Sequence, residues 1–228
     1  MSFLECSGSC NGGVLHYVWC VVDNNLILLG FLWLCWCVMH SALIDRSVTT
    51  AVERRLPNVY RYYRIFYNGV SLVSLVPLLF FTRMADGDVV FSWTGWLVPI
   101  RILLVLIALM LFRAGSRRYD IHYFLGIKQI QSGVGSTLLG ASEEFTREGV
   151  FGIIRHPWYL GSLLFIWSIR SSYPSAVFLA TCILSVYLVV GTLLEERKII
   201  AEYGERYREY QRRVSMLFPW KWLLQKIR

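Results

Sequence analysis

The sequence contains few charged residues. Asp, Glu, Lys and Arg together make up 17% of the 228 residues, whereas 56% of the residues are hydrophobic. The mean hydropathy is +0.49. An ordinary soluble domain has about a quarter of its residues charged, so this composition excludes that class. Charged and apolar residues are also segregated along the chain, which indicates membrane-spanning segments.

Lys and Arg are absent from the first 24 positions. A cleavable secretory signal begins with a positively charged region, so we expect no such signal here. We expect residues 1–24 to form an N-terminal tail outside the cytoplasm. Cys6 and Cys10 lie in this tail, where an oxidising compartment would allow a disulfide between them. No set of His and Cys residues converges there, so we expect no metal site.

Charge is also missing from long runs further along the chain. Residues 66–82 and 172–194 have none, and residues 25–44 contain His40 as the one strongly polar ionisable group. Each run has about the length that crosses a hydrocarbon core of about 30 Å. We therefore predict a transmembrane helix in each of these three runs.

Two further apolar stretches depart from this pattern. Residues 93–112 contain Arg101, whose charge we expect to reach the outer face because Trp96 lies only a few positions before it. Residues 157–169 number only 13, which is short for a span. We predict that they cross nevertheless, joined to the next span by a tight turn at 170–175. The expected fold class is an all-α integral membrane protein with five transmembrane helices, no Rossmann domain and a cytoplasmic C-terminal helical tail.

The basic residues are distributed unevenly. Of the 23 Lys and Arg residues, 20 fall in the segments 45–65, 113–156 and 197–228. Five crossings place these segments on one side, and cytoplasmic loops carry the excess of Lys and Arg. The N-terminus is therefore expected outside and the C-terminus in the cytoplasm. A re-entrant 157–169 would move the tail outside, against this asymmetry. The net charge of +8 fits attraction to anionic lipid headgroups better than nucleic-acid binding.

The chain divides into three parts. After the tail (1–24) comes a three-helix membrane part (25–115), and residues 116–228 hold a long connecting loop, a helical hairpin and the C-terminal tail. We expect 25–115 and 116–228 to form one structural domain. Residues 195–214 have the pattern of an amphipathic helix interrupted at Gly204.

The stretch RHPWYLG, residues 155–161, places polar groups at the mouth of an apolar segment. Pro157 suits the first turn of a helix, and a helix N-terminus offers free N–H groups and partial positive charge. Arg155 adds hydrogen-bond donors, His156 a titratable ring and Tyr159 an aromatic face with a hydroxyl. Two interpretations stay open: a polar pocket for an anionic or zwitterionic ligand, or a basic helix start with interfacial aromatics.

Glu195 and Glu196 directly follow an uncharged run. Carboxylates at the C-terminal end of a helix oppose its dipole, so a basic group should compensate them. The candidates are Arg197, Lys198 and Arg155. Because a helical hairpin brings the start of one helix beside the end of the next, we expect Arg155 and His156 to meet the two glutamates in one pocket.

Other polar residues give weaker signals. His40 lies at the inner end of the first predicted span, where a lone histidine is more often interfacial than catalytic. Tyr119 and Asp120 follow the third predicted span, and Lys128 and Gln129 lie further along the same loop.

The RHPWYLG motif, the paired glutamates after the hairpin and the tyrosine-rich tail together resemble the isoprenylcysteine carboxyl methyltransferase superfamily. The resemblance covers residues 149–219. The stretches MHSAL, RRLPNVYRYYRIFYN and YDIHYFLGIKQ are similar to the branch that holds the methanethiol S-methyltransferases, with nurim and NnrU-type proteins as relatives. The matching residues are Arg155, His156, Pro157, Tyr159, Gly161, Glu195, Glu196, Tyr203, Tyr207, Tyr210 and Pro219.

This resemblance implies a polytopic methyltransferase that uses S-adenosyl-L-methionine without a Rossmann domain. Consistent with that, no G-x-G-x-x-G motif follows a predicted strand. The cofactor would bind in a cytoplasm-facing pocket capped by the C-terminal tail. The residues implied to bind it are Gly149, Arg155, His156, Pro157, Tyr159, Gly161, Glu195 and Glu196.

Three functional hypotheses follow from the resemblance. The favoured one is methylation of a small thiol such as methanethiol to dimethyl sulfide. The others are O-methylation of an isoprenylcysteine carboxylate or lipid-like acceptor, and a non-catalytic nurim-like membrane protein. A thiol must lose its proton to react well, and the candidate catalytic groups are His40, Tyr119 and Arg197. The candidate substrate contacts are Asp120, Lys128, Gln129, Tyr207 and Arg213.

Overall fold

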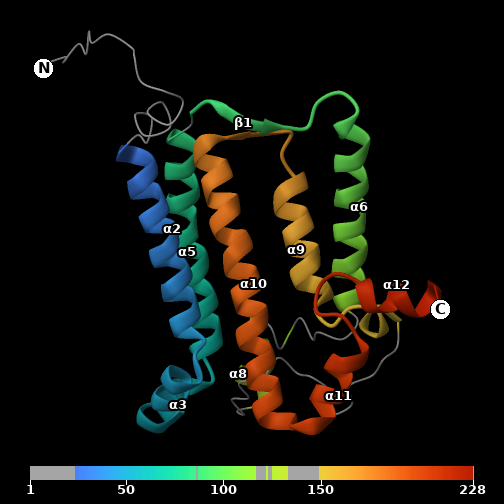
Figure 1. Cartoon of the computed structure of the whole chain (residues 1–228). Coiled ribbons are helices and arrows are strands. Elements are labelled where there is room, and N and C mark those ends of the chain that lie inside the picture. Colours follow the sequence, from blue (N-terminus) through green and yellow to red (C-terminus); the bar gives the residue numbers. More distant parts are fainter. Residues whose placement is uncertain (1–23, 86, 117–121, 123–124, 133–148, 228) are drawn as a thin grey trace, which may run out of the picture.

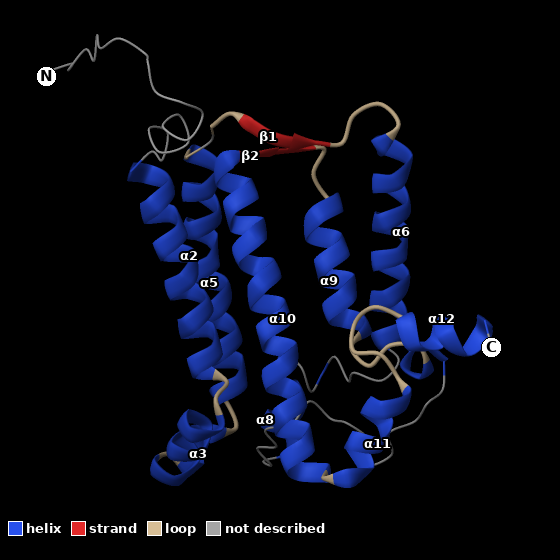
Figure 2. Cartoon of the chain, in the orientation of Figure 1, coloured by secondary structure: helices blue, strands red, loops and turns tan. Residues whose placement is uncertain are grey.

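The structure, a computed structural model, is a mostly helical bundle (Figures 1 and 2). It describes residues 24–85, 87–116, 122, 125–132 and 149–227. Within these ranges, four helices are long and apolar enough to cross a membrane. They are α2 (Asn24–Leu43), α5 (Tyr63–Met84), α6 (Leu97–Ser116) and α10 (Ser175–Tyr203). Each covers most of one predicted span, which confirms the helical membrane class.

Shorter elements lie mostly at the end of the bundle opposite the strands (Figure 1). They are α3 (Arg46–Arg55), α4 (Pro57–Tyr60), α8 (Ile127–Ser132), the 3₁₀ helix η1 (Gly149–Gly152), α11 (Glu205–Arg213) and α12 (Trp220–Ile227). The predicted interruption at Gly204 is confirmed, because α10 ends at Tyr203 and Gly204 has a positive φ of 57°. A residue without a Cβ adopts that conformation at no steric cost.

Helix α10 lies between the α2–α5 pair and the α6–α9 pair and contacts both. It packs against α2 and α5 on one side and against α9 (Pro157–Ser168) on the other, and α9 packs against α6 (Figure 1). The core between α2, α5 and α10 consists of Leu29, Trp33, Leu78, Ala176 and Ala180. The small side chains of Ala176 and Ala180 on α10 face the large ones of α2 and α5, which lets the helices approach closely.

Helices α6 and α9 approach closely at Gly161. A Cβ at this position would lie 3.1 Å from the Phe112 ring and 3.4 Å from the Ala108 carbonyl oxygen. The small size of Gly161 thus has a packing reason, and its predicted contact with a cofactor stays a prediction. Arg101 also joins these helices: its guanidinium donates to the carbonyl oxygens of Ser168 at 2.8 Å and Ile169 at 3.2 Å. Instead of only reaching the outer face, Arg101 caps the C-terminal end of α9.

A two-stranded antiparallel sheet joins the loops at one end of the bundle. Strand β1 (Val89–Ser92) pairs with β2 (Ser172–Pro174) (Figure 2). The predicted tight connection at 170–175 does join α9 to α10, but it contains a strand that the sequence did not predict. The ring of Phe91 contacts that of Tyr173 at a centroid distance of 5.9 Å. The sequence of each loop alone favours a turn, and the strand forms because a second loop far along the chain supplies its partner.

We expect Gly161→Ala to lower the melting temperature of the purified protein, since the new methyl group would overpack the α6–α9 contact. Overpacking usually destabilises by about 1–3 kcal/mol. Gly69→Ala in α5 is the matched control, because a Cβ there meets no described atom within 4 Å. That variant should be neutral or stabilised, by up to about 1 kcal/mol. Differential scanning fluorimetry in detergent measures both, and equal shifts would contradict the close packing.

Candidate active site

The carboxylate of Glu196 is the centre of a buried polar cluster. Its Oε1 accepts hydrogen bonds from Arg155 Nε at 2.6 Å and Tyr207 Oη at 3.1 Å, and lies 3.2 Å from His156 Nε2. Its Oε2 accepts from Gln211 Nε2 at 2.8 Å. Glu196 is 7% exposed, Arg155 9%, His156 3% and Tyr207 2%. We call these five residues the Glu196 cluster.

Two features of the chain build this cluster. Helix α10 continues for two turns beyond its uncharged part and carries Glu196 to the start of α9, where Pro157 occupies the first helical position. The predicted meeting of Arg155 and His156 with Glu196 across the hairpin is therefore confirmed. Arg155 supplies the compensating charge, whereas Arg197 is exposed on α10.

The C-terminal tail adds backbone bonds to the same place. The backbone N–H groups of Arg155 and His156 donate to the carbonyl oxygens of Ser215 at 2.8 Å and Met216 at 3.1 Å. Arg155 Nη1 donates to the carbonyl oxygen of Val214. Residues 214–216 thus run beside the residues that lead into α9 and satisfy backbone donors at a buried site.

Two tyrosines of α11, Tyr207 and Tyr210, are buried, and Tyr207 belongs to the cluster. Tyr210 donates from its hydroxyl to the carbonyl oxygen of Phe151 at 2.6 Å, which ties α11 to η1. Burial, and next the charge of the Glu196 carboxylate, raise the pKa of Tyr207 well above its usual range. Tyr207 therefore stays a neutral O–H donor to Glu196 at physiological pH.

One atom of the Glu196 cluster and one atom of the adjacent Glu195 are buried without a hydrogen-bond partner among the residues that the structure describes. They are Nδ1 of His156 and Oε2 of Glu195. Buried polar atoms are nearly always paired, so each such atom calls for an explanation, and a bound ligand is one of the explanations. Their neighbour Tyr159 holds its ring edge-on to His156, with 5.6 Å between the centroids. The same ring lies against Gly191, where a Cβ would be 3.6 Å from it.

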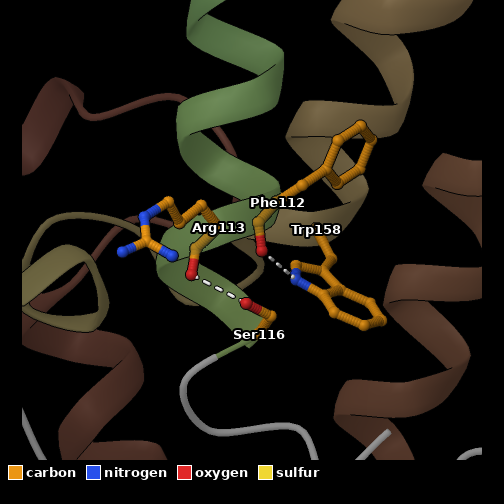
Figure 3. A pocket seen from close by; sticks show the side chains of 4 residues that line it. All are labelled: Phe112, Arg113, Ser116 and Trp158. Atoms are coloured by element: carbon orange, nitrogen blue, oxygen red, sulfur yellow. Dashed lines mark hydrogen bonds between the residues drawn. The ribbon is translucent and has the colours of Figure 1, made fainter.

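The side chain of Trp158 contacts α6. Its indole N–H donates to the carbonyl oxygen of Phe112 at 3.0 Å, and its ring lies so close to Gly115 that a Cβ there would be 2.1 Å away. With Phe112, Arg113 and Ser116, Trp158 lines an open pocket of about 500 Å³ between α6 and the start of α9 (Figure 3).

His40 belongs to a polar contact between α2 and α5 and is not part of the Glu196 cluster. Its Nε2 lies 2.8 Å from Tyr67 Oη and its Nδ1 3.1 Å from Ser71 Oγ. Its ring stacks on Trp36 at a centroid distance of 5.0 Å. Both ring nitrogens thus have protein partners, which is the usual state of a histidine that links helices. Its catalytic role stays a prediction.

The other predicted residues are placed as follows. Arg213 pairs with Glu209 at 2.6 Å on the exposed side of α11. Lys128 is exposed on α8, and Gln129 beside it is 3% exposed. Gly149 begins η1 with a φ of 59°. Tyr119 and Asp120 lie outside the described residues.

Sequence reasoning missed Gln211 and the backbone of residues 214–216. Gln211 lies four positions after Tyr207, so both are on one face of α11, and this spacing could have identified it. The backbone contacts of 214–216 have no signal in the side chains, because carbonyl oxygens accept hydrogen bonds whatever the residue type.

We expect Glu196→Gln to destabilise the packing of residues 205–217, since it leaves the Arg155 guanidinium buried without its counter-ion. Removing one partner of a buried ion pair typically costs about 3–5 kcal/mol. Glu202→Gln is the matched control, because Glu202 pairs with Arg46 at 2.9 Å at a partly exposed position on the same helix, and such pairs contribute about 0–1 kcal/mol. Hydrogen exchange of residues 205–217 should rise only in Glu196→Gln. Equal exchange in the two variants would contradict the role of Glu196.

Comparison with known proteins gives one family and several named relatives. Residues 26–218 match the model of the NnrU protein family. Methanethiol S-methyltransferase 1 of Bradyrhizobium diazoefficiens is 38% identical over 72 residues, which cover 32% of this chain and 25% of the relative. The Pseudomonas deceptionensis methanethiol S-methyltransferase is 38% identical over 71 residues, 31% of this chain and 26% of the relative.

The methanethiol S-methyltransferase of Mycobacterium tuberculosis matches over more of its length. It is 25% identical over 212 residues, which cover 86% of this chain and 77% of that protein. The first two matches span only about a quarter of the relatives they align with. No solved structure matches this chain. Because the family model covers most of the sequence, the chain belongs to the NnrU protein family.

Proposed function

We propose that this protein is a membrane methyltransferase that uses S-adenosyl-L-methionine and methylates a small thiol such as methanethiol to dimethyl sulfide. The family match and the names of the aligned relatives support this function. One structural observation carries it: the start of α9, the end of α10 and the tail converge around Glu196, and beside them Glu195 Oε2 and His156 Nδ1 are buried without a partner among the described residues.

The residues at this site fit the proposed cofactor. S-adenosyl-L-methionine carries an ammonium group, a sulfonium and ribose hydroxyls, all of which a carboxylate attracts or accepts hydrogen bonds from. Glu195 has such an oxygen buried and available. His156 offers a ring nitrogen that donates or accepts depending on its tautomer. We assign direct contact to Glu195, His156 and Tyr159.

Glu196 and Arg155 receive a positioning role in this proposal. Both oxygens of Glu196 already accept hydrogen bonds from protein groups, and Arg155 donates to Glu196 and to two tail carbonyls. These bonds fix the His156 ring and hold the tail beside it. A preorganised binding group loses less entropy when its ligand arrives, so positioning residues raise affinity without touching the ligand.

When bound, the cofactor supplies a methyl group on a positively charged sulfur. A site that held the deprotonated thiol in line with this methyl group would lower the barrier to transfer, in which the new carbon–sulfur bond forms as the bond to the sulfonium sulfur breaks and a neutral thioether leaves. Burial under α11 excludes water, which favours a reaction that removes charge from the leaving sulfur. His40, Tyr119 and Arg197 stay predictions for the group that handles the thiol proton.

We also propose five membrane crossings within one structural domain, with α9 as the short fifth crossing. The path of the chain supports this count: it enters α9 beside the Glu196 cluster and leaves it toward β2 at the opposite end of the bundle (Figure 1). A re-entrant segment would return to the end where it began. With five crossings, the Glu196 cluster and the tail lie on the cytoplasmic side, together with most of the Lys and Arg residues.

The proposed reaction can be tested with the full chain in lipid nanodiscs. Supplied with S-adenosyl-L-methionine and methanethiol, it should release dimethyl sulfide into the headspace, measured by gas chromatography. Glu195→Gln should weaken cofactor binding in calorimetry by roughly tenfold or more, the usual effect of losing a hydrogen bond to a charged group. Glu202→Gln is the control and should bind normally. Absence of cofactor binding would exclude both the thiol S-methyltransferase and the O-methyltransferase hypotheses. Methylation of a prenylcysteine analogue without formation of dimethyl sulfide would show that a small thiol is not the acceptor.

The proposed topology predicts the side of the C-terminus. In a bacterial host, a green fluorescent protein fused after residue 228 should fluoresce, whereas alkaline phosphatase at the same position should be inactive. Fusion of alkaline phosphatase within β1, after residue 90, should give active enzyme as the control. The reverse pattern at the C-terminus would show an even number of crossings.

A further inference from the structure

Helix α12 exposes its apolar side chains, whereas a helix on the surface of a soluble protein buries them. Its apolar side chains Trp220, Leu223, Leu224 and Ile227 follow the spacing i, i+3, i+4 and i+7, which places them on one stripe. The stripe is 54%, 48%, 56% and 82% exposed at these positions. Phe218, just before the helix, is 64% exposed. The apolar stripe of α12 therefore points away from the protein.

Two polar residues of α12, Lys221 and Gln225, bind the protein instead. Lys221 Nζ donates to the backbone carbonyl oxygens of Gln211 at 2.5 Å and Arg212 at 3.1 Å. Gln225, one turn later, donates to the carbonyl oxygen of Arg213 at 3.5 Å. These carbonyl oxygens belong to the last turn of α11, which lacks intrahelical donors. Lys221 and Gln225 thus have partners within the chain, while the apolar stripe belongs to no hydrophobic core among the residues that the structure describes.

The direction of α12 differs from that of the long helices. In Figure 1 it lies across them, beside the end of α6 and level with the start of α9. Since α6 is apolar enough to span a membrane and ends at Ser116, α12 lies near the depth where the apolar span gives way to polar residues. Amphipathic helices that lie in the plane of a membrane bury an apolar face at this depth, and tryptophan is enriched there.

We propose that α12 is an interfacial helix whose stripe of Trp220, Leu223, Leu224 and Ile227 inserts at the boundary between lipid headgroups and acyl chains of the bilayer that the bundle spans. The exposed apolar area, the satisfied polar side and the crosswise direction each favour a lipid surface as the occupant. Lys226, whose Nζ lies 5.7 Å from the Trp222 ring centre, is exposed at the far end of the helix, where lipid phosphates can bind it.

This anchor is joined directly to the candidate active site. The backbone N–H of Lys221 donates to Ser215 Oγ at 3.0 Å, and the Ser215 carbonyl oxygen accepts from the backbone N–H of Arg155 at 2.8 Å. Ser215 is 1% exposed. Insertion of α12 into the bilayer would therefore hold residues 214–216 against the start of α9.

Spin labels on the full chain in lipid nanodiscs test the inserted stripe. In a background with the native cysteines replaced by alanine, Leu224→Cys carries a label on the stripe and Gln225→Cys carries the matched control on the polar side. Power saturation measures collisions with oxygen, which partitions into the bilayer, and with a water-soluble nickel chelate. We expect the label at 224 to collide mainly with oxygen, at a depth of about 5–10 Å. The label at 225 should be shallower.

Two results would overturn the proposal. Equal access of the nickel chelate to both labels would place the stripe in water. Protection of the label at 224 from both collision partners, together with a dimer by light scattering, would show that a second copy of the chain covers the stripe. Neither measurement needs cofactor or thiol, so the outcome is independent of the proposed reaction.

A second variant tests the link to the site. Leu223→Glu combined with Leu224→Glu should raise hydrogen exchange of residues 214–217 at least several-fold in nanodiscs and leave α9 and α10 unchanged. Gln225→Glu is the matched control and should leave the exchange of 214–217 as it is. Unchanged exchange in the double variant would contradict a membrane anchor for this segment.

Discussion

The buried Glu196 carboxylate is the constraint on which the rest of the site depends. A carboxylate and a guanidinium withdrawn from water lose several kcal/mol each in hydration, and their mutual attraction compensates for this only when the remaining donors and acceptors are also paired. Here Arg155 donates to Glu196, and Tyr207 and Gln211 supply further donors from α11. The cluster therefore forms only when α9, α10 and α11 are all in place.

This dependence explains why one long helix carries both a membrane span and part of the site. Helix α10 runs without interruption for 29 residues, so its packing against α2, α5 and α9 fixes the position of Glu196. The rise of 1.5 Å per residue puts Glu196 roughly 30 Å from the start of the helix, about the thickness of a hydrocarbon core. A break after the apolar part would let the two glutamates move independently of the hairpin. The continuous helix prevents that.

Much of the fold could be predicted from the sequence because the membrane imposes simple rules. Runs of about 20 apolar residues must be helical, since no water satisfies their backbone groups, and this located α2, α5, most of α6 and the apolar part of α10. The partner of Glu196 was also predictable, because a helical hairpin brings the start of its first helix beside the end of its second, and Arg155 stands at that start. The β1–β2 pair and the bonds of Arg101 to the end of α9 could not be found. Both join segments far apart in the sequence. Local sequence does not distinguish a turn at 170–175 from a strand, or an Arg101 that reaches the outer face from one that caps α9.

The tail illustrates the same limit in another way. The spacing of Tyr207 and Tyr210 indicates that α11 has a buried face, which packs against Ile199, Ile200 and Tyr203 of α10. The hydroxyl of Tyr210, however, donates to the backbone carbonyl oxygen of Phe151, a partner that has no residue-type signal. In α12 the periodicity is visible, yet it gives only the existence of an apolar stripe and not its direction. Lys221 decides the direction, because the unpaired carbonyl oxygens at the end of α11 attract its ammonium group. Once that side is fixed, the apolar stripe must face outward, where a bilayer can cover it and water would be unfavourable. The carbonyl oxygens at the end of α11 thus orient α12 through Lys221. Through Ser215, the start of α12 is also bound to Arg155 of the Glu196 cluster.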